Sequence, residues 1–84
     1  MVEDNQQLLV NFGRFEEDSK WFYKNIDLLR RKNFTGKFVA IKNKNVIDSN
    51  NNVDVLINSL ESKGENPSYL VIEFVHPQGT IILL

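Results

Sequence analysis

The side chains most able to do chemistry are few in this chain of 84 residues, which has one histidine and no cysteine. The stretch Asp48–Asn52 begins like a calcium loop, with oxygen-bearing side chains at its first, third and fifth positions. Val53, however, occupies the sixth position, where that loop requires glycine, and Ser59 occupies the twelfth, where a bidentate glutamate belongs. The sole histidine, His76, precedes a proline, and the sequence places no nucleophile or further ligand beside it. We therefore predict a protein that is not an enzyme, with no catalytic residue, no cofactor and no metal site.

The composition indicates one small domain. Hydrophobic residues make up 42% of the chain and charged residues 25%, and the net charge is −1. This balance argues against a protein that coats nucleic acid, because such a protein needs a basic surface. The N-terminus is acidic and polar and the apolar runs are short, so we predict a cytoplasmic protein with no secretory signal and no membrane contact. Residues 1–14 are predicted to be an extension, as a short strand or partly disordered, and residues 15–84 a single α+β domain.

Periodicity and turn residues predict two helices and four strands. Phe22, Ile26 and Leu29 follow a helical stripe, and Asp18 or Ser19 is the expected N-cap. The predicted elements are a helix over about residues 18–32, strands over 37–42 and 45–48, a helix over 53–63, and strands over 69–75 and 80–84. This α-β-β-α-β-β order predicts an α+β fold of two layers, in which both helices lie on one face of a small, mainly antiparallel sheet.

The first two strands are predicted to form a tight hairpin. Asn43-Lys44 is the expected turn, because asparagine tolerates a positive φ, although glycine would suit the second position better. This turn places Ile41 opposite Val46 and Ala40 opposite Ile47.

Several motifs in this half of the chain resemble a known family. They are Trp21, Leu28-Leu29, the segment Phe34-x-Gly36-Lys37-x-Val39-Ala40-Ile41, and the return strand Asn43-Lys44-x-Val46-Ile47. Together they look like a small uncharacterised prokaryotic family, classed as a domain of unknown function, whose members carry an aromatic-x-Gly-Lys-x-Val-Ala-Ile hairpin segment. The resemblance covers about residues 21–75 and implies the fold without implying any catalytic residue. Two features depart from the pattern: the turn is usually Asp-Gly or Asn-Gly, and the tail at 80–84 is extra.

Independently of that resemblance, Gly36 is expected where the chain turns sharply from helix to strand, which requires a backbone angle that other residues avoid. Phe34 is expected to fill the junction between helix and sheet.

The most informative feature of the sequence is that the predicted strands are apolar on both faces. Because side chains alternate along a strand, two helices on one face would leave a second apolar face uncovered. We predict that this interaction face contains Phe38, Ala40, Ile47, Tyr69, Val71 and Val75. Three occupants are open: the segment Leu8–Phe12, a second copy of the chain, or a partner protein, with the strand edge at Thr80–Leu84 as a further contact. We predict a protein-interaction module, with homodimerisation as its main form and no small-molecule substrate.

The alternative function is binding of single-stranded nucleic acid on an open sheet face. Aromatic side chains would stack on bases while lysines meet the phosphates, and the residues for these roles are Phe38, Tyr69, Lys37, Lys42 and Lys44. The overall acidity, Glu73 on the same face and the lack of arginine in the hairpin disfavour this alternative.

Overall fold

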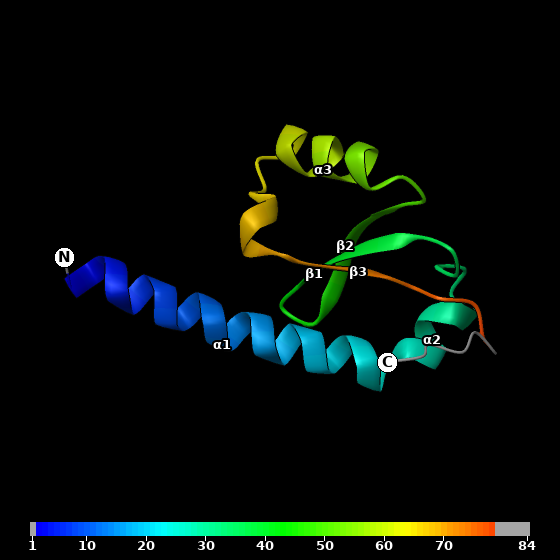
Figure 1. Ribbon diagram of the computed structural model, residues 1–84, viewed down its shortest axis with the longest axis horizontal. Helices are drawn as coiled ribbons and strands as arrows, with labels where there is room; N and C mark the ends of the chain where they lie inside the picture. The colour runs from blue at the N-terminus through cyan, green and yellow to red at the C-terminus, as the bar shows by residue number, and fades with distance from the viewer. Residues whose placement is uncertain (1, 79–84) are drawn as a thin grey trace.

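The computed structural model describes the backbone of residues 2–78 and, from residue 13 onward, their side chains. Helices and strands follow one another as Figure 1 shows. The elements are α1 (Val2–Lys24), α2 (Ile26–Arg31), β1 (Phe38–Lys42), β2 (Asn45–Asn50), α3 (Val53–Ser62), the 3-10 helix η1 (Pro67–Tyr69) and β3 (Val71–Phe74). The α+β class predicted from the sequence is confirmed, and the strand predicted at Thr80–Leu84 lies outside the described residues.

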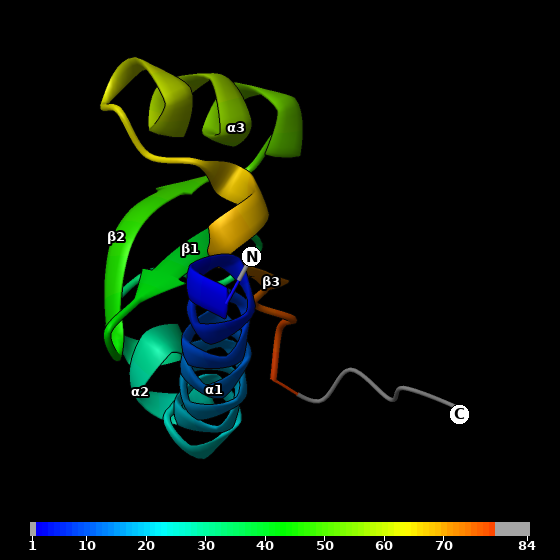
Figure 2. The ribbon, with the colours of Figure 1, turned by 90° about the vertical axis from the view of Figure 1, so that its left-hand side faces the viewer.

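The sheet lies between helices and not beneath a single helical layer (Figures 1 and 2). Its strand order is β2-β1-β3, and both pairings are antiparallel. Helices α1 and α2 cover one face, here called the α1 face, and α3 covers the other, the α3 face. The prediction that both helices share one face is therefore wrong. Each face of the sheet is apolar, so each requires its own cover.

Helix α1 begins well before the sequence cues place it. It runs from Val2 to Lys24, so a helix capped by Asp18 or Ser19 is wrong, and the segment predicted as a strand or extension has a helical backbone. Asp18 lies inside the helix and is buried against the sheet, at 3% exposed. The helix ends at Lys24, and the next residue, Asn25, donates to the carbonyl of Trp21 from its backbone amide at 3.0 Å and from its Nδ2 at 2.9 Å.

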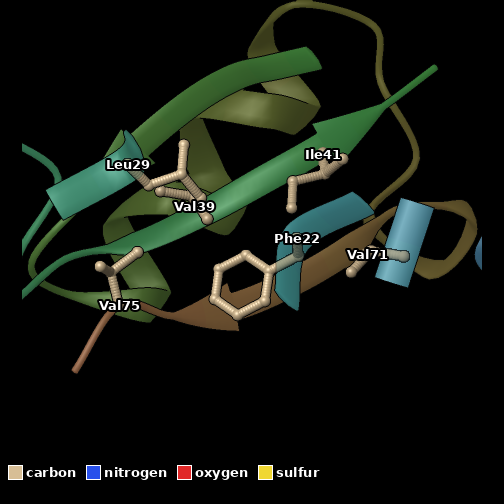
Figure 3. Close-up of a cluster of buried hydrophobic side chains, with 6 residues drawn as sticks. All are labelled: Phe22, Leu29, Val39, Ile41, Val71 and Val75. Atoms are coloured by element: carbon tan, nitrogen blue, oxygen red, sulfur yellow. The ribbon is translucent and has the colours of Figure 1, made fainter. Parts of the chain in front are cut away.

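The larger core lies on the α1 face. Figure 3 shows Phe22 of α1 and Leu29 of α2 pointing at valine and isoleucine side chains of β1, at the valine that begins β3 and at the valine that follows it. The buried members of this core are Phe22, Leu29, Val39, Ile41, Val71 and Val75. Phe34 packs against this core, which confirms its predicted place at the junction of helix and sheet.

The smaller core lies on the α3 face. Leu56 and Leu60, one helical turn apart on α3, bury themselves against Ala40 at the centre of the sheet. The partly buried side chains around these three are Phe38, Ile47, Leu70 and Ile72. Helix α3 packs mainly over β2, so its cover is thinner towards β3.

The predicted hairpin turn is confirmed. Asn43 and Lys44 have φ angles of 52° and 60°, the two positive values that a type I′ turn requires. The carboxylate of Asp18 accepts hydrogen bonds from the Asn43 amide at 3.2 Å and from the Lys44 amide at 2.8 Å. A buried acid on α1 thus holds the hairpin turn in place.

The register of the hairpin is only partly as predicted. Ile41 does pair with Val46, but Ala40 pairs with Asp48 and not with Ile47, because a β-bulge shifts the register at this point. As a result, two successive residues of β2 both meet the α3 face: Ile47 packs into its core, and Asp48 bonds to side chains of α3.

A bulge at Gly36 determines which residues of β1 pair with which residues of β3. Gly36 has a φ of 78°, and the Lys37 amide donates to the Phe34 carbonyl at 3.1 Å across the turn. The Gly36 amide donates to the Val75 carbonyl at 2.8 Å, and the Val75 amide donates to the Lys37 carbonyl at 2.9 Å. Two residues of one chain segment therefore oppose one of the other, a bulge that begins at a glycine. The prediction that this position needs glycine is confirmed by the angle and not by crowding, since the place of a Cβ is open.

Candidate interaction surface

Strand β3 is an edge strand, and its hydrogen-bonding parity follows from Val75. The amide and carbonyl of Val75 bond to residues just before β1, so they point toward β1. Backbone groups alternate in direction along a strand, so those of Glu73 and Val71 also point toward β1. Ile72 and Phe74, the residues between, point their amides and carbonyls away from the sheet. No backbone group of residues 2–78 and no side chain of residues 13–78 bonds to these outward amides and carbonyls.

Local contacts mark both ends of this open edge. At the start of β3, the Leu70 amide donates to the Pro67 carbonyl at 3.2 Å, which closes the 3-10 turn before the strand. Beyond the end of β3, the Nε of Arg30 donates to the His76 carbonyl at 2.9 Å. The open edge therefore runs from the Leu70 carbonyl to the Phe74 carbonyl.

Apolar side chains flank the open edge on the α3 face. Leu70 and Ile72 are half-buried beside the α3-face core, and Phe74 is half-buried one position further along. The ring of Phe74 lies between two others, with its centroid 5.0 Å from Phe38 and 4.8 Å from the imidazole of His76. The edge thus carries a strip of partly exposed apolar surface, which backbone pairing alone does not require.

A hollow of about 220 Å³ lies beside β3, between the strand and the helices α1 and α2. Its lining residues are Phe22, Tyr23, Ile26, Arg30, Glu73, Phe74 and His76. Tyr23 projects from α1 with 61% of its surface exposed, and its ring meets Phe22 edge to face at 5.1 Å between centroids. Apolar surface is therefore exposed on both sides of the open edge.

The six residues predicted to form an interaction face do not form one face. Phe38, Ala40 and Ile47 lie on the α3 face, where α3 covers them. Val71 and Val75 are buried on the α1 face against α1 and α2, and Tyr69 is 56% exposed in η1. The two alternating sets of side chains in each strand are as predicted. The prediction of which set of β3 shares a face with Phe38 is wrong, by a shift of one residue. The residues that do accompany Phe38 on its face are Leu70, Ile72 and Phe74, the alternate set of the same strand.

The residues predicted for nucleic-acid binding are also dispersed. Phe38 and Lys42 stand at opposite ends of β1, and the Nζ of Lys42 contacts both carboxylate oxygens of Glu65, at 3.0 and 3.1 Å. Lys44 lies beside Trp21 near α1, in a separate hollow. Lys37 and Tyr69 lie in the turn before β1 and in η1 respectively. No open sheet face brings these side chains together in the described part of the chain.

The opposite edge of the sheet, β2, holds the clearest electrostatic feature. The carboxylate of Asp48 accepts from the Ser49 amide at 2.8 Å, the Ser59 hydroxyl at 2.7 Å and the Lys63 ammonium at 3.0 Å. The Ser59 hydrogen bond foremost, and the Lys63 contact after it, lower the pKa of Asp48 below its ordinary value. The bonds from Ser59 and Lys63 tie the edge strand to α3 and to the residue that follows it.

Two further hollows open on the surface. One, of about 490 Å³, is lined by Asp27, Arg30, Arg31, Thr35 and Gln78, and the other by Glu17, Lys20, Trp21, Lys24 and Lys44. Among the described residues, no group of three histidine, cysteine or acidic side chains is placed to hold a metal ion. In the same part of the chain, no helix combines the length and apolarity that crossing a membrane demands.

Comparison with known protein families gives a match over the part of the chain that forms the sheet. Residues 31–77, more than half of the chain, match a family of unknown function (DUF5678). No curated protein and no solved structure matches the chain. The matched residues contain the whole sheet, α3 and the open edge of β3, whereas α1 lies outside the match. This chain belongs to the family of unknown function DUF5678.

Proposed function

We propose that this protein is a protein-interaction module that binds an extended chain segment along the open edge of β3. The observation that carries the proposal is the outward-facing backbone of Ile72 and Phe74, bordered by half-buried apolar side chains. Addition of a strand to such an edge supplies backbone hydrogen bonds, and the flanking apolar side chains supply burial and specificity.

The chemistry of the edge supports a protein occupant over a nucleic acid. Glu73 is the only charged residue of β3, and it is acidic, so the strand itself offers phosphates no cation. The lysines of the nucleic-acid alternative lie elsewhere, and one of them is paired with Glu65. Apolar side chains beside unpaired backbone groups are what a second polypeptide strand complements.

The test measures the solution mass by light scattering over about a hundredfold dilution, for the wild type and for an edge-blocked variant. Ile72→Pro removes an amide that points away from β1, so the sheet keeps its own hydrogen bonds while the edge loses a donor. Phe74→Lys is the second blocking variant, and it acts by placing a charge in the apolar strip. Val55→Lys is the matched control, because Val55 is an exposed apolar residue on the far side of α3.

Two results support the proposal. In the first, the wild type and Val55→Lys form dimers that both blocking variants lose, while circular dichroism shows all four proteins folded. In the second, the wild type stays monomeric, but peptides selected from a displayed random library bind it and lose binding to both blocking variants. The proposal is overturned if the dimer persists in both blocking variants, or if the wild type is a monomer that selects no peptide sensitive to them.

A further inference from the structure

We infer that the strand bound at the β3 edge is β3 of a second copy. The two strands pair antiparallel across a two-fold axis that passes midway between their Ile72 residues, an arrangement called here an axis at Ile72. This inference rests on the proposed function, and it adds the partner and its register. An axis perpendicular to the sheet is the one that pairs two identical strands antiparallel, and it keeps α1 of both copies on the same side of a continuous six-stranded sheet.

The hydrogen-bonding groups of the edge are arranged symmetrically about Ile72. In this register the two Ile72 residues exchange both their amide–carbonyl bonds, and the Phe74 amide of each copy reaches the Leu70 carbonyl of the other. The Leu70 amide is not needed, which agrees with its bond to the Pro67 carbonyl within its own chain. Four hydrogen bonds form, and no outward amide of β3 is left unpaired.

The side chains of the edge also complement themselves in this register. Ile72 meets Ile72 of the other copy, and Phe74 meets Leu70, all on the α3 face where the cover by α3 is thin. On the α1 face, Glu73 meets Val71 and avoids its own copy. Pairs of aromatic, aliphatic and β-branched side chains across neighbouring strands are the stabilising ones. The two copies thereby cover each other's apolar strip.

The neighbouring registers are each less favourable. An axis at Glu73 places two carboxylates directly opposite, about 4.5 Å apart at their Cα atoms, which is destabilising. An axis at Phe74 brings the other strand against the His76 carbonyl, where the Arg30 guanidinium already lies. An axis at Val71 runs the pairing into the 3-10 helix η1 and leaves fewer bonds.

The test exploits the absence of cysteine from the chain. Ile72→Cys, Glu73→Cys and Phe74→Cys are each oxidised at a concentration where the wild type is dimeric, and disulfide-linked dimer is measured by non-reducing gel. In the inferred register, the two Cys residues at position 72 have Cα atoms about 5.5 Å apart, within disulfide range. Those at position 73 are about 8 Å apart and those at 74 about 14 Å, beyond that range. We expect about ten times more linked dimer for Ile72→Cys than for either other variant.

Three results would overturn the inference, and the proposed function is judged by its own experiment above. Strongest linkage at position 73 would move the axis to Glu73. A dimeric mass with no linkage at any of the three positions would assign the dimer to another surface. A wild type that is monomeric at every concentration would exclude the second copy, and the peptide selection above would then decide whether the edge binds other chains. Ile72→Ser is the control for Ile72→Cys, because it removes the isoleucine without adding a thiol. Circular dichroism of each variant shows whether loss of the dimer comes from misfolding.

Discussion

The two edges of this small sheet are built in opposite ways. At the β2 edge, a bulge interrupts the regular spacing of outward backbone groups, and the outward Ser49 amide is already bonded to the Asp48 carboxylate at 2.8 Å. At the β3 edge, the register is regular over all four residues, and no described side chain reaches the outward amides of Ile72 and Phe74. Bulges and side chains that cover backbone groups are the usual means of protecting an edge from other strands.

Among the described residues, edge protection is local and is found at the β2 edge. The bulge in β2 turns Asp48 toward Ser59 and Lys63 of α3, so the same device that closes the edge also anchors the helix. An edge left open beside half-buried aromatic and aliphatic side chains is what the proposed addition of a strand requires.

The largest expected effect is on Asp18, whose hydrogen bonds hold the turn at the start of β2. Asp18→Ala removes the carboxylate that accepts from the Asn43 and Lys44 amides and leaves both amides without this partner. We expect a loss of about 3 kcal/mol in the free energy of unfolding, measured by urea denaturation, because hydrogen bonds to a charged acceptor are among the stronger ones. Glu17→Ala, at an exposed neighbouring position on α1, is the matched control and should change little. A loss below about 1 kcal/mol for Asp18→Ala would show that the closed side of the sheet does not depend on this acid.

A smaller effect is expected from the carboxylate that covers the β2 edge. The pKa of Asp48 is lowered in the folded state, so its charged form contributes stability above the unfolded pKa of about 3.9 and loses that contribution as the pH falls through the lower folded value. Wild type should therefore exceed Asp48→Asn by about 1 kcal/mol in free energy of unfolding at pH 7, and the difference should shrink by pH 2 to 3. Urea denaturation of both proteins across this range measures it. A difference that stays constant with pH would mean that the ionised carboxylate does not secure this edge.

The sequence predicted local structure well and long-range phase poorly. The Asn43-Lys44 turn and the need for glycine at position 36 depend on neighbouring residues, and the structure confirms both. The N-cap of α3 is equally local, because the Asn52 side chain accepts from the Asp54 and Val55 amides. The start of α1 was missed because Asp18 and Ser19 are residue types that favour an N-cap, whereas Asp18 is used in a contact with residues about 25 positions further along the chain.

The candidate surface was missed for a related reason. Each strand's two sets of alternating side chains can be read from the sequence, but which set of β3 joins which set of β1 depends on the pairing of Phe38 with Phe74. The bulge at Gly36 determines that pairing, and a one-residue change exchanges the faces. The sequence indicated a sharp turn at this glycine, but not the bulge or its effect on register.

The smallest expected effect sharpens the comparison at the turn that begins β2. Lys44 has a φ of 60°, a conformation that glycine adopts at little cost and that a lysine adopts at some cost. Because Asp18 bonds to the backbone amide at this position and not to the lysine side chain, Lys44→Gly keeps the clamp while relieving the angle. We expect a gain of about 0.5–1 kcal/mol in the free energy of unfolding, measured by urea denaturation. Lys44→Ala should show no such gain, since alanine shares the steric cost of the positive φ, and Asn43→Gly should gain less because asparagine tolerates that region. Equal gains for Lys44→Gly and Lys44→Ala would mean that the effect comes from losing the lysine side chain beside Trp21. The positive φ of Lys44 would then carry no measurable cost in stability.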